Sequence, residues 1–301
     1  MIYTVTFNPA IDYVVHLENY LQSGKINRCT DETYQFGGKG INVAMMLRNL
    51  GYDAIALGFI AGETGSWLQS ELHNVGLLTN FIRLPSGMTR INVKVKGNEE
   101  TEINGSGPVI SLADIERLYA QLDVLKSGDI LVLAGNIPAC LASDTYEKIM
   151  RRLAVRNIII VVDATRDLLV NVLPYQPFLI KPNNHELGEI FGREQKTDQE
   201  IIECAAKLQA CGARNVLVSM EKDGALLLDE TGKIHRMAAP NGKVRNSVGA
   251  GDSMVAGFLT GWLQTGNYEK ALRLGTAAGS ATACSLGLAS KEEIDAMLAK
   301  M

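Results

Sequence analysis

Short β-branched runs alternate with amphipathic helical patterns along most of this chain, and this alternation constrains its fold more than any other feature. Several runs, such as Asp129–Ala134, Asn157–Asp163 and Asn215–Met220, are apolar at consecutive positions rather than at every second one. Strands of that kind are buried on both faces, as in a parallel sheet covered by helices. The pattern therefore predicts an α/β fold with a doubly wound, mostly parallel sheet flanked by helices.

The same alternation gives approximate bounds for the other elements. Further strands are predicted at Ile2–Phe7, Ala54–Ile60 and Phe178–Lys181, and helices at Ile41–Leu50, Ser111–Lys126, Ser143–Val155 and Asp198–Cys211. The last three helices each begin with a Ser or Asp that can cap the first turn.

Two segments interrupt the alternation, at about residues 12–36 and about residues 90–105. In the second, Ile91–Lys96 alternates apolar and polar side chains, which is typical of a sheet with one face in water. We expect the two segments to form a small β-strand lid beside the main sheet. No linker or internal repeat interrupts the chain, so residues 1–301 are expected to form a single domain.

Composition narrows the class of protein. The 301 residues carry 29 Lys+Arg and 33 Asp+Glu and are 47% hydrophobic, which excludes a disordered chain. A mildly acidic chain without a basic run is not expected to bind nucleic acid, and the absence of a long apolar run argues against a membrane span. The N-terminus has no basic start region, and the five cysteines are scattered. We therefore expect a soluble, cytoplasmic protein that acts on small molecules.

The most informative motif is Asn246–Ser253 (Asn-Ser-Val-Gly-Ala-Gly-Asp-Ser), which leads directly into an apolar helical pattern. The backbone amides of Gly249, Ala250 and Gly251 can converge on an anion there, and the helix dipole adds partial positive charge. Asp252 is poorly placed to bind phosphate but well placed to take a proton from an attacking hydroxyl. The alternative is a tight turn in which Asp252 only caps the helix.

A second glycine-rich turn, Gly37–Ala44, contains the cation Lys39 and also leads into a helix. By itself it fits an exposed turn with a solvated lysine as well as it fits a phosphate-binding loop. It is not a Walker A motif, because no Gly-Lys pair is followed by Ser or Thr, and no G-x-G-x-x-G opens the first helix. A P-loop NTPase and a simple Rossmann dehydrogenase both lose support.

Taken together and in this order, the two motifs resemble the two signatures of the ribokinase-like (PfkB) family of sugar kinases. The resemblance spans nearly the whole chain, through the segments 8–12, 37–42, 181–186, 219–224 and 248–252. It implies a ribokinase-like fold and phosphoryl transfer from ATP with Mg²⁺. The segments 89–94 and 100–105 most resemble those members that phosphorylate fructose 1-phosphate at its C6 hydroxyl.

The resemblance also implies roles for individual residues, with Asp252 as the general base beside Gly249, Ala250 and Gly251. The residues implied to contact the sugar phosphate are Asp12, Gly38, Lys39, Asn42, Arg90 and Asn104, with Arg90 on the existing phosphate and Lys39 as a second candidate for it. Those implied to contact the nucleotide are Lys181, Asn183, Ser219, Glu221, Gly224, Gly251 and Ser280. Asn183 and Glu186 have the family's N-x-x-E spacing, which is implied to hold Mg²⁺ through water.

The chain departs from the family pattern at Glu221, where many members carry glycine. Either the carboxylate points outward while its backbone still contacts ATP, or the affinity for ATP falls. We expect the former, because Lys222 and Gly224 follow. The small residues from Gly275 to Ser280 resemble a flexible stretch that lines the adenine pocket, although Ala-rich helices more often serve close packing.

Other interpretations stay open at this stage. The substrate could be tagatose 6-phosphate or fructose 6-phosphate, because the geometry of the lid decides where the existing phosphate binds. A sugar-phosphate sensor without turnover is a rival from another class, which the presence of Gly249, Gly251 and Asp252 disfavours. The resemblance also suggests a homodimer formed through the lids.

Overall fold

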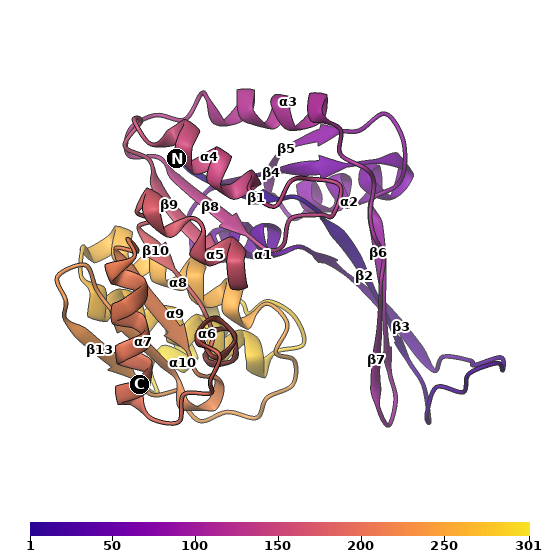
Figure 1. Ribbon diagram of the computed structural model, residues 1–301. Coiled ribbons are helices and arrows are strands. Elements are labelled where there is room, and N and C mark those ends of the chain that lie inside the picture. Colours follow the sequence, from indigo (N-terminus) through magenta and orange to yellow (C-terminus); the bar gives the residue numbers. More distant parts are fainter.

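The computed structural model describes all 301 residues, and its nine-stranded main sheet has helices on both faces (Figure 1). The strand order is β13-β12-β11-β10-β9-β8-β1-β4-β5, and all neighbours are parallel except at β12 and β13. The strands are β1 (Ile2–Thr6), β4 (Ala54–Ile60), β5 (Leu78–Arg83), β8 (Ile130–Ala134), β9 (Ile159–Asp163), β10 (Leu179–Ile180), β11 (Asn215–Ser219), β12 (Ala225–Leu228) and β13 (Ile234–Met237). The predicted fold class is confirmed.

Each face of this sheet packs against its own set of helices. In β8, Ile130 and Val132 belong to one apolar cluster while Leu131 and Leu133 belong to the other, so the strand is buried on both sides. The first cluster contains side chains of α1 (Lys39–Asn49), α2 (Gly62–Asn74), α8 (Ala250–Thr265), α9 (Tyr268–Cys284) and α10 (Lys291–Leu298). The second contains side chains of α3 (Leu112–Leu122), α4 (Thr145–Leu153), α5 (Arg166–Val170), α6 (Asn184–Phe191) and α7 (Asp198–Ala210).

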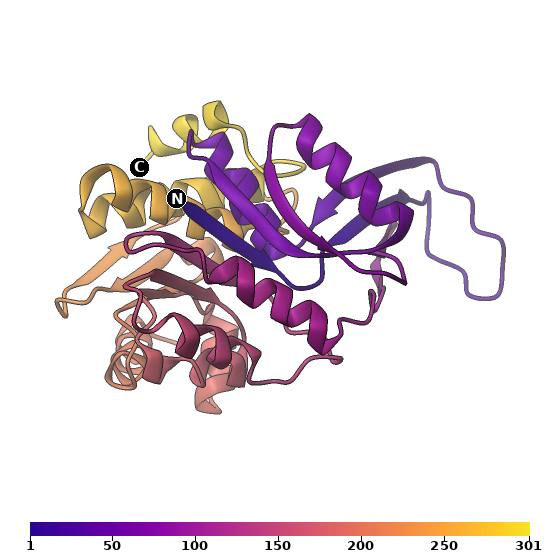
Figure 2. The same ribbon diagram turned by 90° about the horizontal axis from the view of Figure 1, so that it is seen from above.

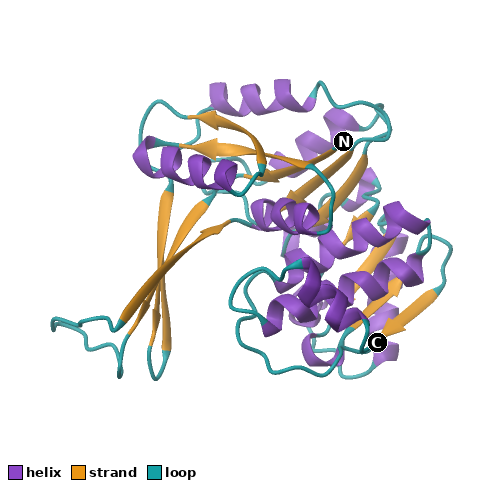
Figure 3. Ribbon diagram, turned by 180° about the vertical axis from the view of Figure 1, so that it is seen from behind, coloured by secondary structure: helices purple, strands orange, loops and turns teal.

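A separate four-stranded sheet projects away from the main body (Figures 1 and 3). Its order is β3 (Asp31–Gly37), β2 (Ala10–His16), β6 (Arg90–Lys96) and β7 (Glu100–Asn104). The β2–β6 pair is parallel and the outer pairs are antiparallel. The connection between β2 and β3 extends farthest from the body (Figure 2). These are the two segments for which a lid was predicted, and their function as a lid stays a prediction.

The observed elements differ from the predicted ones mainly at their ends. The helix predicted to begin at Ile41 begins at Lys39, inside the glycine-rich turn, and the strand predicted at Phe178–Lys181 is limited to Leu179–Ile180. The small residues at Gly275–Ser280 lie inside α9, so this stretch is helical. No helix combines the length and the apolar character needed to cross a membrane.

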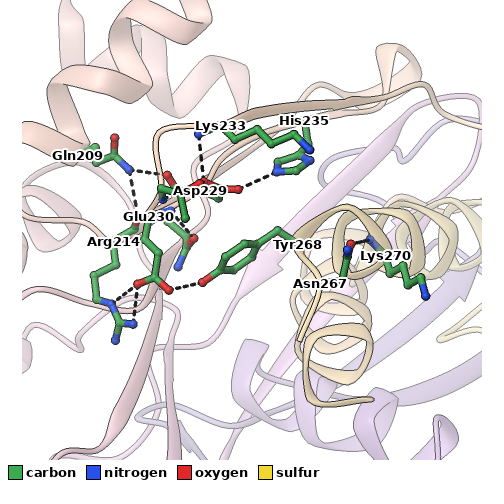
Figure 4. A network of polar contacts seen from close by, with 11 residues as sticks. Gln209, Arg214, Asp229, Glu230, Lys233, His235, Asn267, Tyr268 and Lys270 are labelled. Carbon is green, nitrogen blue, oxygen red and sulfur yellow. Dashed lines mark hydrogen bonds and ion pairs between the residues drawn. The ribbon is translucent and has the colours of Figure 1, made fainter. Parts of the chain in front are cut away.

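A polar network fixes the amino-terminal edge of the parallel strands, at the turn between β12 and β13 (Figure 4). His235 and Asp229 share a buried hydrogen bond of 2.7 Å. Glu230 accepts hydrogen bonds from Arg214 at 2.7 Å and from the hydroxyl of Tyr268, the first residue of α9, at 2.5 Å. The network therefore ties this hairpin to α9, at the edge of the sheet opposite the carboxyl ends of the parallel strands.

Candidate active site

A cavity of about 820 Å³ lies where the carboxyl ends of the main-sheet strands meet the second sheet. Open α/β sheets hold their ligands at this edge. All of the residues predicted from the sequence line this cavity: Asp12, Gly38, Lys39, Asn42, Arg90, Asn104, Lys181, Asn183, Glu186, Ser219, Glu221, Gly224, Gly249, Ala250, Gly251, Asp252 and Ser280. The fold thus brings them together from both sheets and from the starts of α1 and α8. Their individual roles stay predictions.

Asp252 lies in the first turn of α8 and is only 5% exposed. Its carboxylate accepts a hydrogen bond of 2.7 Å from the side chain of Asn42, a residue predicted to contact sugar. Burial and, to a smaller extent, the negative charge of Asp163 together raise the pKa of Asp252 to about 6, against the opposing effect of Lys39. A carboxylate with this pKa is a stronger base than an exposed one and is still largely ionised at neutral pH.

Some of the backbone amides at the start of α8 have no hydrogen-bond acceptor within the protein. Gly249 caps the helix with a φ of 80°, a left-handed conformation that favours glycine. The amides of Gly249 and Gly251 have no acceptor within the protein, whereas that of Ala250 donates to the carbonyl of Ser247 at 3.2 Å. Two free amides beside the dipole of a 16-residue helix are suited to bind an anion, and their role as an anion-binding site stays a prediction. The Ala250 amide would have to leave Ser247 to join them.

Asp163, at the carboxyl end of β9, is a site residue that sequence reasoning missed. It is 1% exposed, and its Oδ1 lies 3.3 Å from the ammonium groups of both Lys39 and Lys181. Burial by itself would raise the pKa of Asp163, but the two lysines outweigh burial and lower it. Burial likewise opposes the charged form of Lys39, yet the surrounding carboxylates raise its pKa. The sequence does contain a signal for this residue, because Asp163 is an acidic residue at the end of a predicted apolar strand.

The second sheet supplies the other polar end of the cavity. Asp12 on β2 is 7% exposed and accepts a hydrogen bond of 2.8 Å from Asn92 on β6. Lys94, also on β6, lies 3.3 Å from the other oxygen of Asp12. Arg90 is half-buried, which lowers its pKa, and it donates to the carbonyl of Asn8 at 3.2 Å. The sequence analysis did not predict Asn92 and Lys94 as site residues, although both lie in the segment 89–94 on which part of the family resemblance rests.

The N-x-x-E pair forms the start of α6. Asn183 Oδ1 accepts from the amide of Glu186, and Glu186 Oε2 accepts from the amide of Asn183, both at 2.8 Å. This is a capping box, so the spacing has a structural function in addition to any metal function. Glu186 Oε1 has no partner, and the buried Oδ2 of Asp163 has none either. No three His, Cys, Asp or Glu side chains are grouped to hold a metal ion. Such a sparse set of oxygens fits a hard cation that retains water.

Glu221 begins a short 3₁₀ turn (Glu221–Asp223), which Met220 separates from the end of β11. Its side chain is 71% exposed and lies 3.5 Å from His185, also exposed. The backbone of Glu221 has a φ of 49°, in the left-handed region where a side chain is disfavoured. The prediction that this side chain points outward is consistent with its exposure.

Helix α9 borders the cavity with only part of its small-residue segment. Thr276, Gly279 and Ser280 line the cavity. Gly275 instead packs against α8, where a Cβ atom would lie 2.9 Å from the carbonyl of Met254. The segment therefore combines close helix packing with a wall of the cavity.

Comparisons with known proteins agree with this geometry. A family model described as pfkB family carbohydrate kinase matches residues 5–295. The 1-phosphofructokinase of Bacillus subtilis (strain 168) is 45% identical over 298 residues, covering 99% of this chain and 97% of that protein. The D-tagatose-1-phosphate kinase of Bacillus licheniformis is 38% identical over 297 residues, covering 98% and 96%. The crystal structure of phosphofructokinase-2 from Escherichia coli with fructose-6-phosphate has a TM-score of 0.90 at 29% identity, covering 99% and 98%.

Proposed function

This chain belongs to the pfkB family of carbohydrate kinases, and from that we propose that it transfers a phosphoryl group from ATP to the C6 hydroxyl of fructose 1-phosphate. The products are fructose 1,6-bisphosphate and ADP. One observation supports phosphoryl transfer as the type of reaction. The buried carboxylate of Asp252, whose pKa is raised, lies beside two free helix-terminal amides in a cavity that has cations at both ends. The choice of substrate is supported by the 45% identity to a 1-phosphofructokinase over nearly the whole chain.

In the proposed mechanism, the C6 hydroxyl oxygen attacks the γ-phosphorus of ATP while the bond to the bridging oxygen of ADP breaks. Asp252 accepts the hydroxyl proton as the new bond forms. Asn42 holds the carboxylate toward the cavity through its 2.7 Å hydrogen bond. The amides of Gly249 and Gly251, joined by that of Ala250, stabilise the negative charge on the transferred group.

Mg²⁺ would be held through water by Asn183 and Glu186, and when bound it would neutralise charge on the phosphates of ATP. Glu186 is suited to this because one carboxylate oxygen stays free after the capping box has formed. Lys39 and Lys181, both paired with Asp163, line the same cavity, where Lys39 would contact the sugar phosphate and Lys181 the nucleotide.

The remaining residues divide between the two substrates. The nucleotide would lie along Ser219, Glu221 and Gly224, with its base against Ser280 on α9. The sugar phosphate would lie between the start of α1 and the second sheet, where Asp12 accepts hydrogen bonds from sugar hydroxyls and Arg90 binds the phosphate. Gly38 and Asn104 border the same space.

We also propose that the second sheet acts as a lid over the sugar and pairs with the lid of a second copy. Its two faces differ: Asp12, Asn92 and Lys94 face the cavity. Tyr34 and Ile103, at the alternate register positions, are 47% and 59% exposed. Apolar side chains left in water on one face of a sheet favour burial against a partner.

The experiment measures ADP release by the purified chain with Mg·ATP and one sugar phosphate at a time. The panel contains fructose 1-phosphate, fructose 6-phosphate, tagatose 6-phosphate and tagatose 1-phosphate, with Asp252→Asn as the blank. The last substrate is included because a D-tagatose-1-phosphate kinase is 38% identical to this chain. Preference for fructose 1-phosphate supports the proposal. Preference for another sugar phosphate would overturn the proposed substrate but would still support phosphoryl transfer. If no sugar phosphate is turned over, the result favours a sugar-phosphate sensor that binds without catalysis.

A further inference from the structure

Lys94 has no assigned function, yet it is the cation nearest to the carboxylate predicted to bind the sugar. Its ammonium lies 3.3 Å from Asp12 Oδ2 and 3.8 Å from Glu102 on β7, and its side chain is 14% exposed. Both acidic partners line the same cavity. The side chain of Asp12 is 10% exposed and that of Glu102 is 49% exposed, so water screens the pair with Asp12 less.

The position of Asp12 is determined by three neighbouring groups before any substrate binds. Asn92 donates to Oδ1 at 2.8 Å, while Lys94 approaches Oδ2. On the β3 side, a Cβ atom at Gly37 would lie 2.9 Å from Oδ2, so only a glycine leaves room for this carboxylate. Asn92 is itself fixed, because its Oδ1 accepts from the amide of Gly105 at 3.2 Å.

The charge balance at this end of the cavity depends on Lys94. Arg90 and Lys94 are the cations that the second sheet contributes to the cavity, and Asp12 and Glu102 are its carboxylates. Lys39 is already paired with Asp163 at 3.3 Å. Without Lys94, two carboxylates would face Arg90 alone, and an anionic substrate would be repelled. A neutral sugar would not be repelled.

We propose that Lys94 is the residue that adapts this site to phosphorylated rather than neutral sugars, by neutralising Asp12 and holding its carboxylate toward the sugar hydroxyls. The inference rests on the proposed function, since it concerns the sugar end of the same cavity. Lys94 acts through Asp12 as a positioning residue, and its effect falls on sugar-phosphate binding rather than on the transfer step.

The test compares Lys94→Met, which removes the charge at nearly constant volume, with Lys94→Arg and with Lys96→Met. Lys96 is a matched control: it lies two positions further along β6, pairs with Glu100 at 3.5 Å and does not line the cavity. Lys94→Met should raise the KM for fructose 1-phosphate by at least about tenfold. It should leave the KM for ATP within about twofold, and it should lower kcat/KM for neutral fructose less than it lowers kcat/KM for fructose 1-phosphate.

Lys94→Arg should recover most of the sugar-phosphate affinity, and Lys96→Met should match the native chain. A KM for fructose 1-phosphate within about twofold of the native value in Lys94→Met would overturn the inference. Equal rises for both substrates, or the same effect in Lys96→Met, would overturn it as well, because both outcomes indicate general damage to the sheet.

Turnover by the native chain decides the proposed function separately from this inference. If the native chain prefers another sugar phosphate, the KM values of the variants and of the native chain are compared for that compound, because the charge argument applies to any phosphorylated sugar. If it turns over none, the dissociation constant of fructose 1-phosphate is measured by calorimetry. Tighter binding by the native chain than by Lys94→Met then supports the inference, and equal constants overturn it.

Discussion

The side chain of Asn42, in the first turns of α1, donates a buried hydrogen bond of 2.7 Å to Asp252 at the start of α8. The two residues belong to different glycine-rich motifs and are 210 positions apart in the chain. Both helices begin at the carboxyl edge of the main sheet, so their first turns meet across the cavity. The contact joins the predicted sugar-binding turn to the predicted general base.

Asp252→Asn should lower kcat by at least about a hundredfold, because general-base catalysis contributes about 10² to 10⁴. The KM values for both substrates should change little, since the amide keeps the shape of the carboxylate. Steady-state kinetics with fructose 1-phosphate measure the effect, and circular dichroism verifies the fold. A variant with nearly native kcat would show that Asp252 is not the base.

Activity should fall as the pH drops below about 6, because the pKa of Asp252 is raised to about 6 and a protonated carboxyl group cannot accept the proton. Asn42→Ala should move this loss to higher pH, since the hydrogen bond from Asn42 favours the charged form. Profiles of kcat/KM against pH for both proteins test this. Unchanged profiles would argue against the assignment of Asp252.

The same shift predicts how stability changes with pH. Asp252 binds its proton more tightly in the folded chain than in the unfolded chain, where its pKa is near 3.8. Its contribution to stability is therefore present below that value and is lost as the pH rises toward about 6. The Asp252→Asn variant has no group that titrates at this position, so it does not lose this stability as the pH rises. Thermal unfolding should therefore show that the variant becomes more stable relative to the native chain between about pH 4 and pH 7. A difference that does not vary with pH would contradict this.

Arg90→Ala should raise the KM for the sugar phosphate at least about tenfold, through the loss of charge-assisted hydrogen bonds to the phosphate. The KM for ATP should stay within about twofold, because the proposed nucleotide-binding residues Ser219, Glu221 and Gly224 lie at or after the end of β11 in the main sheet, whereas Arg90 belongs to the second sheet. Arg83→Ala serves as a control, since Arg83 lies on the edge strand β5 and bonds to Ser66 on the surface. Equal effects on both substrates would remove the role given to Arg90.

Glu221→Gly should stabilise the chain by up to about 1 kcal/mol, because the φ of 49° costs a side chain energy that glycine avoids. It should leave the KM for ATP within about twofold, because the exposed carboxylate is predicted to point outward. Glu221→Gln separates the loss of charge from the relief of strain, since it loses the charge and keeps the strained backbone. Chemical denaturation and ATP kinetics test both variants, and a Glu221→Gly chain less stable than Glu221→Gln would refute the strain argument.

Most of the architecture could be predicted from the sequence because its signals are local. Consecutive apolar residues at 129–134 and 215–220 indicated strands buried on both faces, and the structure places them in the interior of the main sheet. Elements without such signals were missed, including α2 (Gly62–Asn74), with three buried residues, and the edge strand β5. The buried apolar side chains are only Leu68 and Leu72 in α2 and only Phe81 and Ile82 in β5, so too few apolar positions repeat to define a period.

The glycine-rich turns and many of the acidic and basic residues near them were visible as motifs, so the sequence alone determined the fold class and a large part of the residues that gather around the cavity, but not Asp163, Asn92 or Lys94. Only the tertiary structure decided how they pair. Asp163 bridges Lys39 and Lys181, Asn42 bonds to Asp252, and Lys94 lies against Asp12, each across strands or helices far apart in the chain. Such pairs depend on strand register and on where helices begin in space, and a one-dimensional pattern of neighbouring residues does not encode either.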